Sequence, residues 1–493
     1  MNYARSKVKI YRQKLSFLPD ESRVITKLFG LDKSRIEKVI DRVLNLSDKE
    51  KNRVLEQVIV NFEKRHKNVK RIFKDNFDEI VQHLDTTIYN DLPLEKKLLI
   101  GAYYTLEYSI ESAALFNPSI VPHPFQTQED IANSNLKVIL SFRAVGEGHM
   151  SSVVFRSGLL DKGGNIIMDG ISHLVEMAKI IHSVEYSKQD FIMKLSDMRQ
   201  YDLVKPVFDE LLDAFTSDEL DESVRHFKEK GVLSRKEEEA IDTIYWIIRS
   251  NYEIEFRDES DLSERAIFPR STTDIRAIED ARFVAYSNGY GSYTYYAPYT
   301  AYNGITILPQ LIETKDFYRF KIKTMTGPGS QNKGMALFPK KINGKYAMIS
   351  RNDNENLYIM YSDGLNYWEN PILVREPKFF WEFIQIGNSG SPIKTEKGWL
   401  LLTHGVGPVR TYSLGAIMLD LEDPSKVIAE LKEPLLVPRE TERNGYVPNV
   451  VYSCGALLHN EWIVLPYAAS DTRSGIVRFK LNDLLQQLTP VNN

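Results

Sequence analysis

Apolar side chains recur at helical spacing in the first part of the chain, residues 1–116. They lie three and four positions apart, which is typical of the buried face of an α-helix, at Ile36, Val39, Ile40, Val43 and Leu44. Ser47 and Glu50 then have the spacing of a capping box, in which each side chain binds a free amide at the start of a helix. We therefore predict an N-terminal helical region over residues 1–116.

Helical spacing returns after residue 160. One predicted face carries Leu174, Met177, Ile181 and Val184. Ser234 and Glu237 repeat the capping-box spacing in front of a last apolar helix. Because a strand-like pattern lies on both sides of this stretch, we interpret residues 161–262 as a helical insertion.

Short extended runs, separated by turn dipeptides such as Asn-Gly and Asp-Gly, occupy residues 117–160 and 263–493. We interpret the two segments as the first part and the remainder of one β domain. They supply about 275 residues, and at roughly 40 to 50 residues per four-stranded blade that amounts to about five or six blades of a β-propeller. A large β-sandwich would have the same periodicity.

Composition narrows the class of protein. Apolar residues make up 43% and charged residues 26% of the chain, which is typical of globular proteins and disfavours disordered, collagen-like and membrane-spanning ones. The 63 basic and 67 acidic residues leave a net charge of −4, so that no overall basic field attracts nucleic acid. The single cysteine, Cys454, excludes an internal disulfide and a multi-cysteine metal site. The 26 Tyr and 23 Phe suggest many strands and a stacking surface for a flat ligand.

The chain offers no sign of export or membrane insertion. Its first residues are charged and lack the apolar stretch of a secretory signal. No run of about 18 apolar residues occurs that could span a membrane. We therefore expect a cytoplasmic protein without membrane or nucleic-acid partners.

Polar clusters at the ends of predicted strands are the candidates for chemistry. They are residues 279–282 (Glu-Asp-Ala-Arg), 299–304 (Tyr-Thr-Ala-Tyr-Asn-Gly), Arg351, and His404 with Gly405. Loops at one end of a propeller converge, so that such residues can form one site. Each cluster also has a structural interpretation: a surface ion pair at 279–282, a plain turn at 303–304, and a hydrogen-bonded structural histidine at position 404.

Taken together, the clusters resemble glycoside hydrolase family 130, which comprises β-mannoside phosphorylases and β-mannosidases. The matching stretches are residues 116–118, 140–143, 279–282, 299–304, 337–346, 392–406, 419–424, 442–451 and 468–471. Position 281 holds Ala where the family usually has Pro. The resemblance covers the β segments and implies a mainly β fold, a five-bladed β-propeller. The N-terminal helical region and the helical insertion are additions to the family core.

The resemblance implies roles for individual residues. Asp280 would be the general acid, acting on the leaving oxygen through the mannosyl 3-hydroxyl. Such an acid must hold its proton at the working pH, and we expect burial and the charge of Glu279 to raise its pKa. The residues implied at the mannosyl subsite are Asn117, Arg143, Tyr302, Asn303 and Asp471, with Tyr299 as a further candidate.

The phosphate site of the family would fall on Arg351, Gln385 and His404. The family has Lys at the position of Gln385, so that one cation is missing here. Phosphate is itself the nucleophile in phosphorolysis and needs no protein base, whereas an inverting hydrolase needs a carboxylate that activates water. The two carboxylates that we consider for that task are Glu382 and Glu147.

The function implied is an inverting phosphorylase that cleaves short β-manno-oligosaccharides with phosphate and yields α-mannose 1-phosphate. One alternative is an inverting β-mannosidase acting on β-1,2- or β-1,4-mannosides, and another is a noncatalytic carbohydrate-binding propeller. We expect no metal and no cofactor beyond phosphate as co-substrate. The partners expected are a small carbohydrate and a further copy of the chain, because the helices could support a homo-oligomer.

Overall fold

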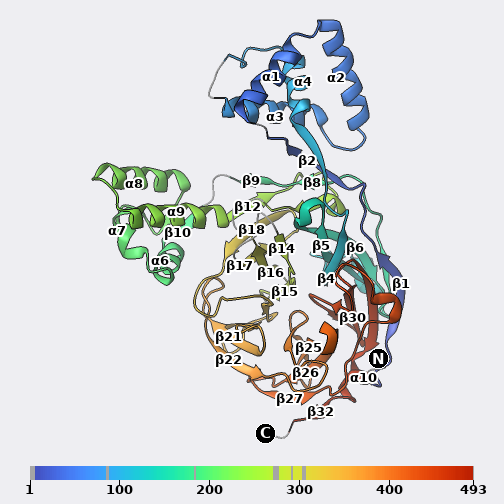
Figure 1. Cartoon of the computed structure of the whole chain (residues 1–493). Coiled ribbons are helices and arrows are strands. Elements are labelled where there is room, and N and C mark those ends of the chain that lie inside the picture. The colour runs from blue at the N-terminus through green and yellow to red at the C-terminus, as the bar shows by residue number, and fades with distance from the viewer. Residues whose placement is uncertain are drawn as a thin grey trace.

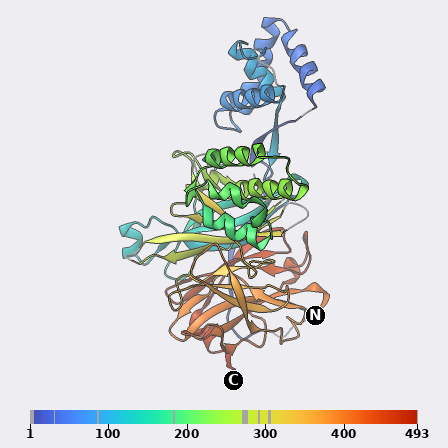
Figure 2. The ribbon, with the colours of Figure 1, turned by 90° about the vertical axis from the view of Figure 1, so that its left-hand side faces the viewer.

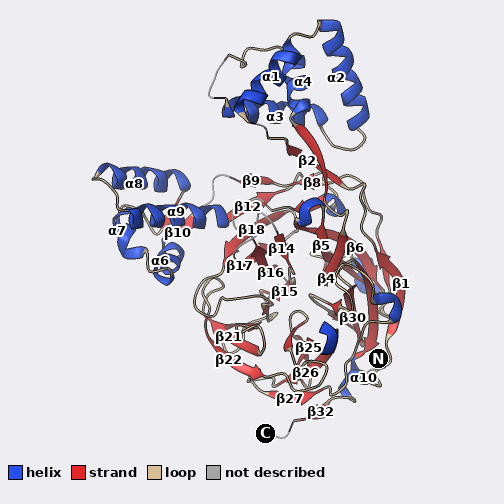
Figure 3. Ribbon diagram, viewed as in Figure 1, coloured by secondary structure: helices blue, strands red, loops and turns tan. Residues whose placement is uncertain are grey.

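Strands make up the body of the molecule, and helices gather in two groups at its periphery (Figure 1, Figure 3). The computed structural model describes residues 6–30, 32–84, 88–181, 185–269, 277–289, 292–302 and 307–491. The predicted mainly β class is confirmed. The sheets follow one another around a common centre (Figure 1).

The described strands form six sheets. The largest contains β4 (Ala114–Pro122), β5 (Leu136–Val145), β6 (Ser151–Leu160), β7 (Ile166–Met168), β8 (Glu176–Met177), β9 (Lys179–Ile181), β12 (Tyr252–Glu255), β13 (Arg265–Ile267), β14 (Ala277–Glu279), β15 (Val284–Ser287), β16 (Tyr293–Tyr302), β17 (Ile307–Thr314) and β18 (Arg319–Thr324). The next contains β19 (Ala336–Leu337), β20 (Tyr346–Ser350), β21 (Leu357–Ser362) and β22 (Glu369–Arg375).

The remaining sheets are two formed mainly by the C-terminal part of the chain and two small two-stranded sheets. One contains β23 (Gln385–Asn388), β24 (Ile393–Thr395), β25 (Gly398–Val406), β26 (Tyr412–Leu419), β27 (Val427–Glu430) and β32 (Thr489–Pro490). Another contains β1 (Tyr11–Phe17), β28 (Val451–Tyr452), β29 (Leu457–His459), β30 (Trp462–Ala469) and β31 (Arg473–Lys480). The two-stranded sheets are β2 (Val24–Leu28) with β3 (Thr105–Ser109), and β10 (Tyr186–Ser187) with β11 (Ala214–Phe215).

The N-terminal helices form a group with its own apolar core, away from the β body and joined to it by β2 and β3 (Figure 1, Figure 2). They are α1 (Lys33–Leu44), α2 (Asp48–Phe62), α3 (Val69–His83) and α4 (Leu94–Tyr103). The predicted capping box is confirmed, because Ser47 accepts a hydrogen bond from the Glu50 amide and the Glu50 carboxylate accepts one from the Ser47 amide.

Residues 1–116, predicted as helical, also contain strands. β1 pairs antiparallel with β31, so that Phe17 lies opposite Ser474. β2 precedes the helical group in the sequence and β3 follows it. The two strands pair with each other, so that Val24 lies opposite Ser109. These pairings join residues far apart in the sequence, and strand formation depends on such neighbours, so the local apolar pattern carried no sign of them.

The second helical group lies within residues 161–262, beside the largest sheet (Figure 1). It contains α6 (Lys188–Asp197), α7 (Tyr201–Asp209), α8 (Ser217–Glu229) and α9 (Arg235–Ser250), and the capping box predicted in front of α9 is confirmed. The expected helix around Met177 and Ile181 is wrong, because these residues lie in β8 and β9 at the border of the sheet. Val184 lies outside the described residues.

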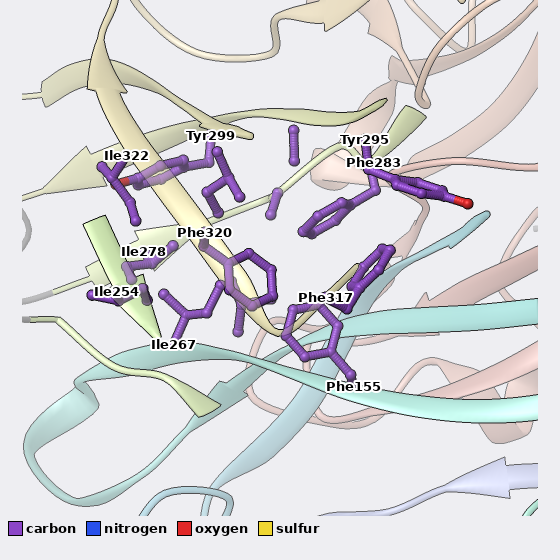
Figure 4. Packing of buried hydrophobic residues seen from close by; sticks show 14 of the residues in the cluster. Phe155, Ile254, Ile267, Ile278, Phe283, Tyr295, Tyr299, Phe317, Phe320 and Ile322 are labelled. Atoms are coloured by element: carbon purple, nitrogen blue, oxygen red, sulfur yellow. The ribbon is translucent and has the colours of Figure 1, made fainter. Parts of the chain in front are cut away.

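Aromatic side chains form much of the apolar core that packs within the largest sheet's domain. Those drawn in Figure 4 include Phe155, Phe283, Tyr295, Tyr299, Phe317 and Phe320. Phe155 stacks on Phe320 with ring centroids 5.8 Å apart. Such pairs add about 0.5–1.5 kcal/mol to the stabilisation from buried area. Part of the aromatic excess that composition linked to a stacking surface therefore belongs to the core.

Two short helices complete the described chain, α5 (Gln128–Ala132) and α10 (Leu481–Leu485), with the 3₁₀ turns η1 (Glu147–His149), η2 (Leu262–Glu264), η3 (Pro408–Arg410) and η4 (Glu440–Glu442). None of the helices in the described part of the chain combines the length and the apolar character needed to cross a bilayer.

Candidate active site

Candidate residues from distant parts of the chain meet where strands of the largest sheet end. Arg143 of β5 lies opposite Phe116 of β4, and the register of β4 shifts directly afterwards, at Asn117. β14 ends at Glu279, so that Asp280 follows at the end of the strand. Nδ2 of Asn117 donates a hydrogen bond of 2.6 Å to Oδ1 of Asp280, and Nη1 of Arg143 is 3.8 Å from the same oxygen. The structure thus brings three predicted site residues together.

Three of the candidate residues have a left-handed backbone. The angle φ is 48° at Asn117, 55° at Asp280 and 51° at Asp471. Only a few per cent of residues other than glycine adopt such angles, Asn and Asp more readily than most, and they cluster at functional sites. The same feature at three positions from separate strands supports a single functional site.

The charge of Glu279 is neutralised by two cations. Its Oε1 accepts a hydrogen bond of 3.0 Å from Arg143 and its Oε2 one of 2.6 Å from Lys333. Although burial would raise the pKa of Asp280, the guanidinium groups of Arg143 and Arg282 outweigh it and, with the amide described above, hold that pKa below its usual 3.8. The expected raised pKa is therefore wrong, and Asp280 is ionised at rest.

Asp471, which follows β30, has the opposite preference. Burial and the negative charge of Asp280 raise the pKa of Asp471 to about 7, against the opposing effects of Arg143 and Arg410. Repulsion between like charges, which we expected to raise the pKa of Asp280, thus raises the pKa of Asp471 instead. A carboxyl group with this pKa retains its proton up to neutral pH and can release it there.

Arg351 and His404, two of the predicted phosphate ligands, are in contact. Nη1 of Arg351 lies 3.3 Å from Nε2 of His404. The other ring nitrogen, Nδ1, donates a hydrogen bond of 2.9 Å to the backbone oxygen of Asn388. Desolvation and the charges of Arg351 and Arg282 hold the pKa of His404 well below its usual 6.5. The ring is therefore neutral, and its Nε2 accepts a hydrogen bond from Arg351.

Gln385, the third predicted phosphate ligand, is in β23 next to the strand of His404. Gly387 lies opposite His404, and Gln385 lies opposite Val406. Because residues two apart on a strand share a face, Gln385 and His404 lie on the same side of the sheet. Position 387 requires glycine, since a Cβ there would lie 2.5 Å from Cε1 of His404.

Arg282 links the two halves of the site, a role to which the sequence analysis assigned no residue. Its side chain is 1% exposed and donates hydrogen bonds to Oδ1 of Asn388 (3.0 Å) and to the hydroxyl of Tyr452 (2.6 Å). Asn388 is the residue whose backbone oxygen also binds His404. The position of Arg282 in the Glu-Asp-Ala-Arg stretch was the signal available, but spacing could not show that the side chain is buried between both groups.

Two tyrosines of β16, Tyr299 and Tyr302, differ in how deeply they are buried. Tyr299 is 4% exposed and its hydroxyl donates a hydrogen bond to Oε1 of Gln310, so that its ring packs in the core (Figure 4). It also lines a small pocket together with Asp280, and its contact with a sugar stays a prediction. Tyr302 is half-buried at the end of β16, opposite Ala277 of β14. Asn303, expected at the mannosyl subsite, lies outside the described residues.

Glu382 and Glu147, the two carboxylates considered as bases, differ in burial and in hydrogen-bond partners. Glu382 is fully buried, and its Oε1 accepts hydrogen bonds from the amides of Lys378 (2.9 Å) and Phe379 (3.1 Å) and from the side chain of Arg375. Glu147 is exposed in η1. Among the described residues, no group of three or more His, Cys, Asp or Glu side chains is arranged to hold a metal ion.

A family model and several known proteins are similar to this chain. The family model of glycoside hydrolase family 130, described as beta-1,4-mannooligosaccharide phosphorylase, matches residues 241–489. A 1,2-beta-oligomannan phosphorylase of Thermoanaerobacter sp. (strain X514) is 37% identical over 224 residues, which are 43% of this chain and 71% of the relative. A beta-1,2-mannobiose phosphorylase of Listeria innocua is 31% identical over 230 residues, 45% of this chain and 63% of that relative.

A crystal structure of the beta-1,2-mannobiose phosphorylase from Listeria innocua in complex with beta-1,2-mannobiose overlaps 76% of this chain and 92% of its own, with 22% identity and a TM-score of 0.44. The family match covers half of the present chain, and the first relative is matched over more than two thirds of its length. The chain therefore belongs to glycoside hydrolase family 130.

Proposed function

We propose that the protein is an inverting glycoside phosphorylase that cleaves short β-mannosides with inorganic phosphate to give α-mannose 1-phosphate. Family membership and the names of the relatives support this reaction class. The observation that carries the proposal is a cationic cluster, Arg351 with His404 and Arg282, adjoining the group of Asp280, Asn117 and Arg143.

The cationic cluster is suited to an oxyanion. Within the described residues, neither Arg351 nor Arg282 forms an ion pair with a carboxylate, and Nε of each is buried without a hydrogen-bond partner. Guanidinium groups bind phosphate oxygens through several directed hydrogen bonds. The neutral His404 adds no repulsive charge for Arg351. Gln385 can add a hydrogen bond but no charge, which predicts weaker phosphate binding than a lysine there would allow.

In the proposed reaction, a phosphate oxygen attacks the anomeric carbon while the bond from that carbon to the leaving oxygen breaks. Holding both reactants in place converts a bimolecular step into a unimolecular one. The leaving oxygen receives a proton, which we assign to Asp280. Arg143, Arg282 and Asn117 hold this carboxyl ionised at rest. The bound sugar must therefore weaken those contacts, so that Asp280 takes up a proton from solvent before it passes that proton to the leaving oxygen.

The proposal includes a five-bladed β-propeller, supported by sheets that follow one another around a common centre (Figure 1). Phosphate is proposed as a co-substrate, without a metal or organic cofactor. A cytoplasmic location would retain the sugar phosphate inside the cell and is part of the proposal, as is a homo-oligomer formed through the added helices.

One observation, the neutral Gln385, favours an inverting β-mannosidase as the second candidate. That reaction requires a carboxylate base beside the anomeric carbon. Glu382 packs against Gly405, where a Cβ would lie 2.4 Å from the Cβ of Glu382. Neighbouring residues on a strand face opposite sides, so that Glu382 and His404 lie on opposite faces of β25. The geometry therefore argues against Glu382 as that base.

The test is to incubate the protein with β-1,2- and β-1,4-mannobiose, with and without phosphate, and to measure mannose 1-phosphate and free mannose. We expect mannose 1-phosphate only when phosphate is present. Asp280→Asn should lower turnover by about 10²–10⁴-fold, the usual contribution of a general acid, while mannobiose still binds. Asp363→Asn, on an exposed turn, is the matched control.

The products decide between the alternatives. Free mannose released without phosphate would show a β-mannosidase. Binding of mannobiose with neither product would show a noncatalytic carbohydrate-binding protein. Normal turnover by Asp280→Asn would remove Asp280 from the mechanism.

A further inference from the structure

Two loops beside the candidate site carry a pair of aromatic rings. His149 lies in η1, between β5 and β6, and Tyr446 lies in the loop that follows η4. Their ring centroids are 5.4 Å apart and the ring planes are inclined by 34°. Both side chains are exposed, Tyr446 by 67%.

The loop of His149 rises from the same strand ends that carry the catalytic candidates. Arg143 is two residues from the end of β5 at Val145, and Val145 lies opposite Ser151, the first residue of β6. The hydroxyl of Ser151 donates a hydrogen bond of 3.1 Å to the backbone oxygen of Ile278, two residues before Asp280. The loop therefore lies at the end of the sheet where the site opens.

The loop of Tyr446 is held beside Asp471. The amide of Tyr446 donates a hydrogen bond of 3.0 Å to Oγ1 of Thr472, the residue after Asp471. The next amide, of Val447, donates one of 3.2 Å to the backbone oxygen of Ser470. The residues on both sides of Asp471 thus fix the position of the tyrosine.

The N-terminal region supports the loop of His149. The hydroxyl of Tyr108, in β3, donates a hydrogen bond of 2.7 Å to the backbone oxygen of Glu147. Lys27 of β2 lies over the ring of Tyr108, and its Nζ is 3.8 Å from Sδ of Met150. The loop packs so closely that a Cβ at Gly146 would lie 2.1 Å from the backbone oxygen of Ser109.

We propose that His149 and Tyr446 form a platform for the sugars on the leaving-group side of the scissile bond, and that Tyr108 is a positioning residue through which the N-terminal region holds this platform. The inference rests on the proposed function. Asn117 and Arg282 are buried around the mannosyl end, so that the rest of an oligosaccharide must extend towards the exposed loops. Aromatic rings at such openings bind the apolar faces of sugars while their polar atoms stay in water.

The first test measures binding, so that it does not depend on turnover. Affinities for methyl β-mannoside, which has a single sugar, and for β-mannotriose are measured by calorimetry or ligand-observed NMR. We expect Tyr446→Ala to lower the ratio of mannotriose to methyl β-mannoside affinity by about tenfold, which corresponds to ~1.4 kcal/mol.

Phe125→Ala is the matched control for this test. Phe125 is 68% exposed and also pairs with a histidine, His123, with ring centroids 5.9 Å apart, but it follows the other end of β4. Its removal should leave both affinities unchanged. A wild-type protein that binds neither sugar would contradict the proposed function itself. A wild-type protein that prefers mannotriose, together with an unchanged ratio in Tyr446→Ala, would overturn the platform alone.

The second test concerns Tyr108. Tyr108→Phe keeps the ring beneath Lys27 and removes only the hydroxyl that binds Glu147. We expect the KM for mannotriose to rise about three- to tenfold, the range expected from one hydrogen bond, with a smaller change in kcat and an unchanged unfolding temperature. An unchanged KM, or a KM that rises only together with a lower unfolding temperature, would overturn the positioning role.

Discussion

At the scale of single residues, the site contains two neighbouring carboxyl groups with opposite preferences for the proton. Asp280 is held ionised by Arg143 and Arg282, whereas burial and the charge of Asp280 raise the pKa of Asp471 to about 7. Two carboxylates that repel each other share protons unequally, and the one nearer the cations loses its proton first. The carboxyl group of the site that titrates near neutral pH is thus Asp471, which motif matching places at the mannosyl subsite.

This difference predicts how stability depends on pH. The folded protein keeps the Asp471 proton up to about pH 7, whereas the unfolded chain loses it near 3.8. The contribution of this group to stability therefore declines as the pH rises through that window, by up to about 1.4 kcal/mol per pH unit. Asp471→Asn removes the decline, so that its free energy of unfolding relative to wild type should increase from pH 4.5 to 7.

Asp353→Asn is the control for this measurement by urea unfolding at several pH values. Although desolvation opposes the shift, hydrogen bonds from the amides of Asn356 and Glu355 lower the pKa of Asp353 to about 2. The stability that ionised Asp353 contributes is fully present above its usual pKa of 3.8. The loss of unfolding free energy in Asp353→Asn should therefore be the same at pH 5 and at pH 7. A constant difference for Asp471→Asn as well would contradict the raised pKa.

At the scale of elements, the pairing of β23 with β25 positions the phosphate-binding candidates. Opposite residues on antiparallel strands are close neighbours, so that the side chain at 387 must be absent for His404 to lie against β23 and contact Arg351. A shift of one residue in this register would move Gln385 to the other face of the sheet. The same strand register therefore places Gln385 on the face of His404 and Gly387 directly opposite that histidine.

Gly387→Ala tests this arrangement. The added Cβ would lie 2.5 Å from Cε1 of His404, so that the imidazole must move, and its contact with Nη1 of Arg351 moves with it. We expect the KM for phosphate to rise at least about tenfold, because a shift of about 1 Å at a positioned group has effects of that order or larger, with a smaller change in mannobiose affinity. Gly364→Ala is the control, since nothing lies within 4 Å of its Cβ. Equal KM values for both variants would refute the role of Gly387.

At the scale of the whole molecule, the N-terminal region is joined to the β body by a buried ionic group. Glu111 is fully buried and binds Nε of Arg23 at 2.6 Å and Nη2 of Arg156 at 2.9 Å. Arg23 also donates hydrogen bonds to the backbone oxygens of Ser172, within the insertion region, and of Ser263, directly after it. One carboxylate thus ties together the N-terminal segment and strand β6, and Arg23 extends the network to the insertion.

Removing the carboxylate of Glu111 should lower the stability of the fold. Glu111→Gln leaves two guanidinium groups buried with no charge opposite them, for which we expect a loss of about 3–5 kcal/mol in the free energy of unfolding. Asp209→Asn is the control, because Asp209 pairs with Lys205 where both side chains are 54% exposed, and such pairs contribute at most about 1 kcal/mol. Urea unfolding at pH 7 measures both. Similar losses for the two variants would show that the buried group does not stabilise the junction.

The sequence by itself determined the features that depend on neighbours along the chain. Apolar spacing and the capping residues Ser47 and Ser234 identified the starts of α2 and α9, because helices are held by contacts between residues three and four apart. Family motifs grouped Asp280 with Asn117 and Arg143, and the structure places them in contact. The family itself was also recognisable from these motifs, since they recur in a fixed order.

Only the tertiary structure decided the features that depend on partners distant in the sequence. The pairing of β1 with β31 and the short strands β8 and β9 arise from such neighbours. Protonation belongs to this class as well, because it depends on which charges surround a group after folding. Spacing placed Glu279 next to Asp280, but only the folded chain shows that Lys333 and Arg143 neutralise Glu279 and that the raised pKa belongs to Asp471.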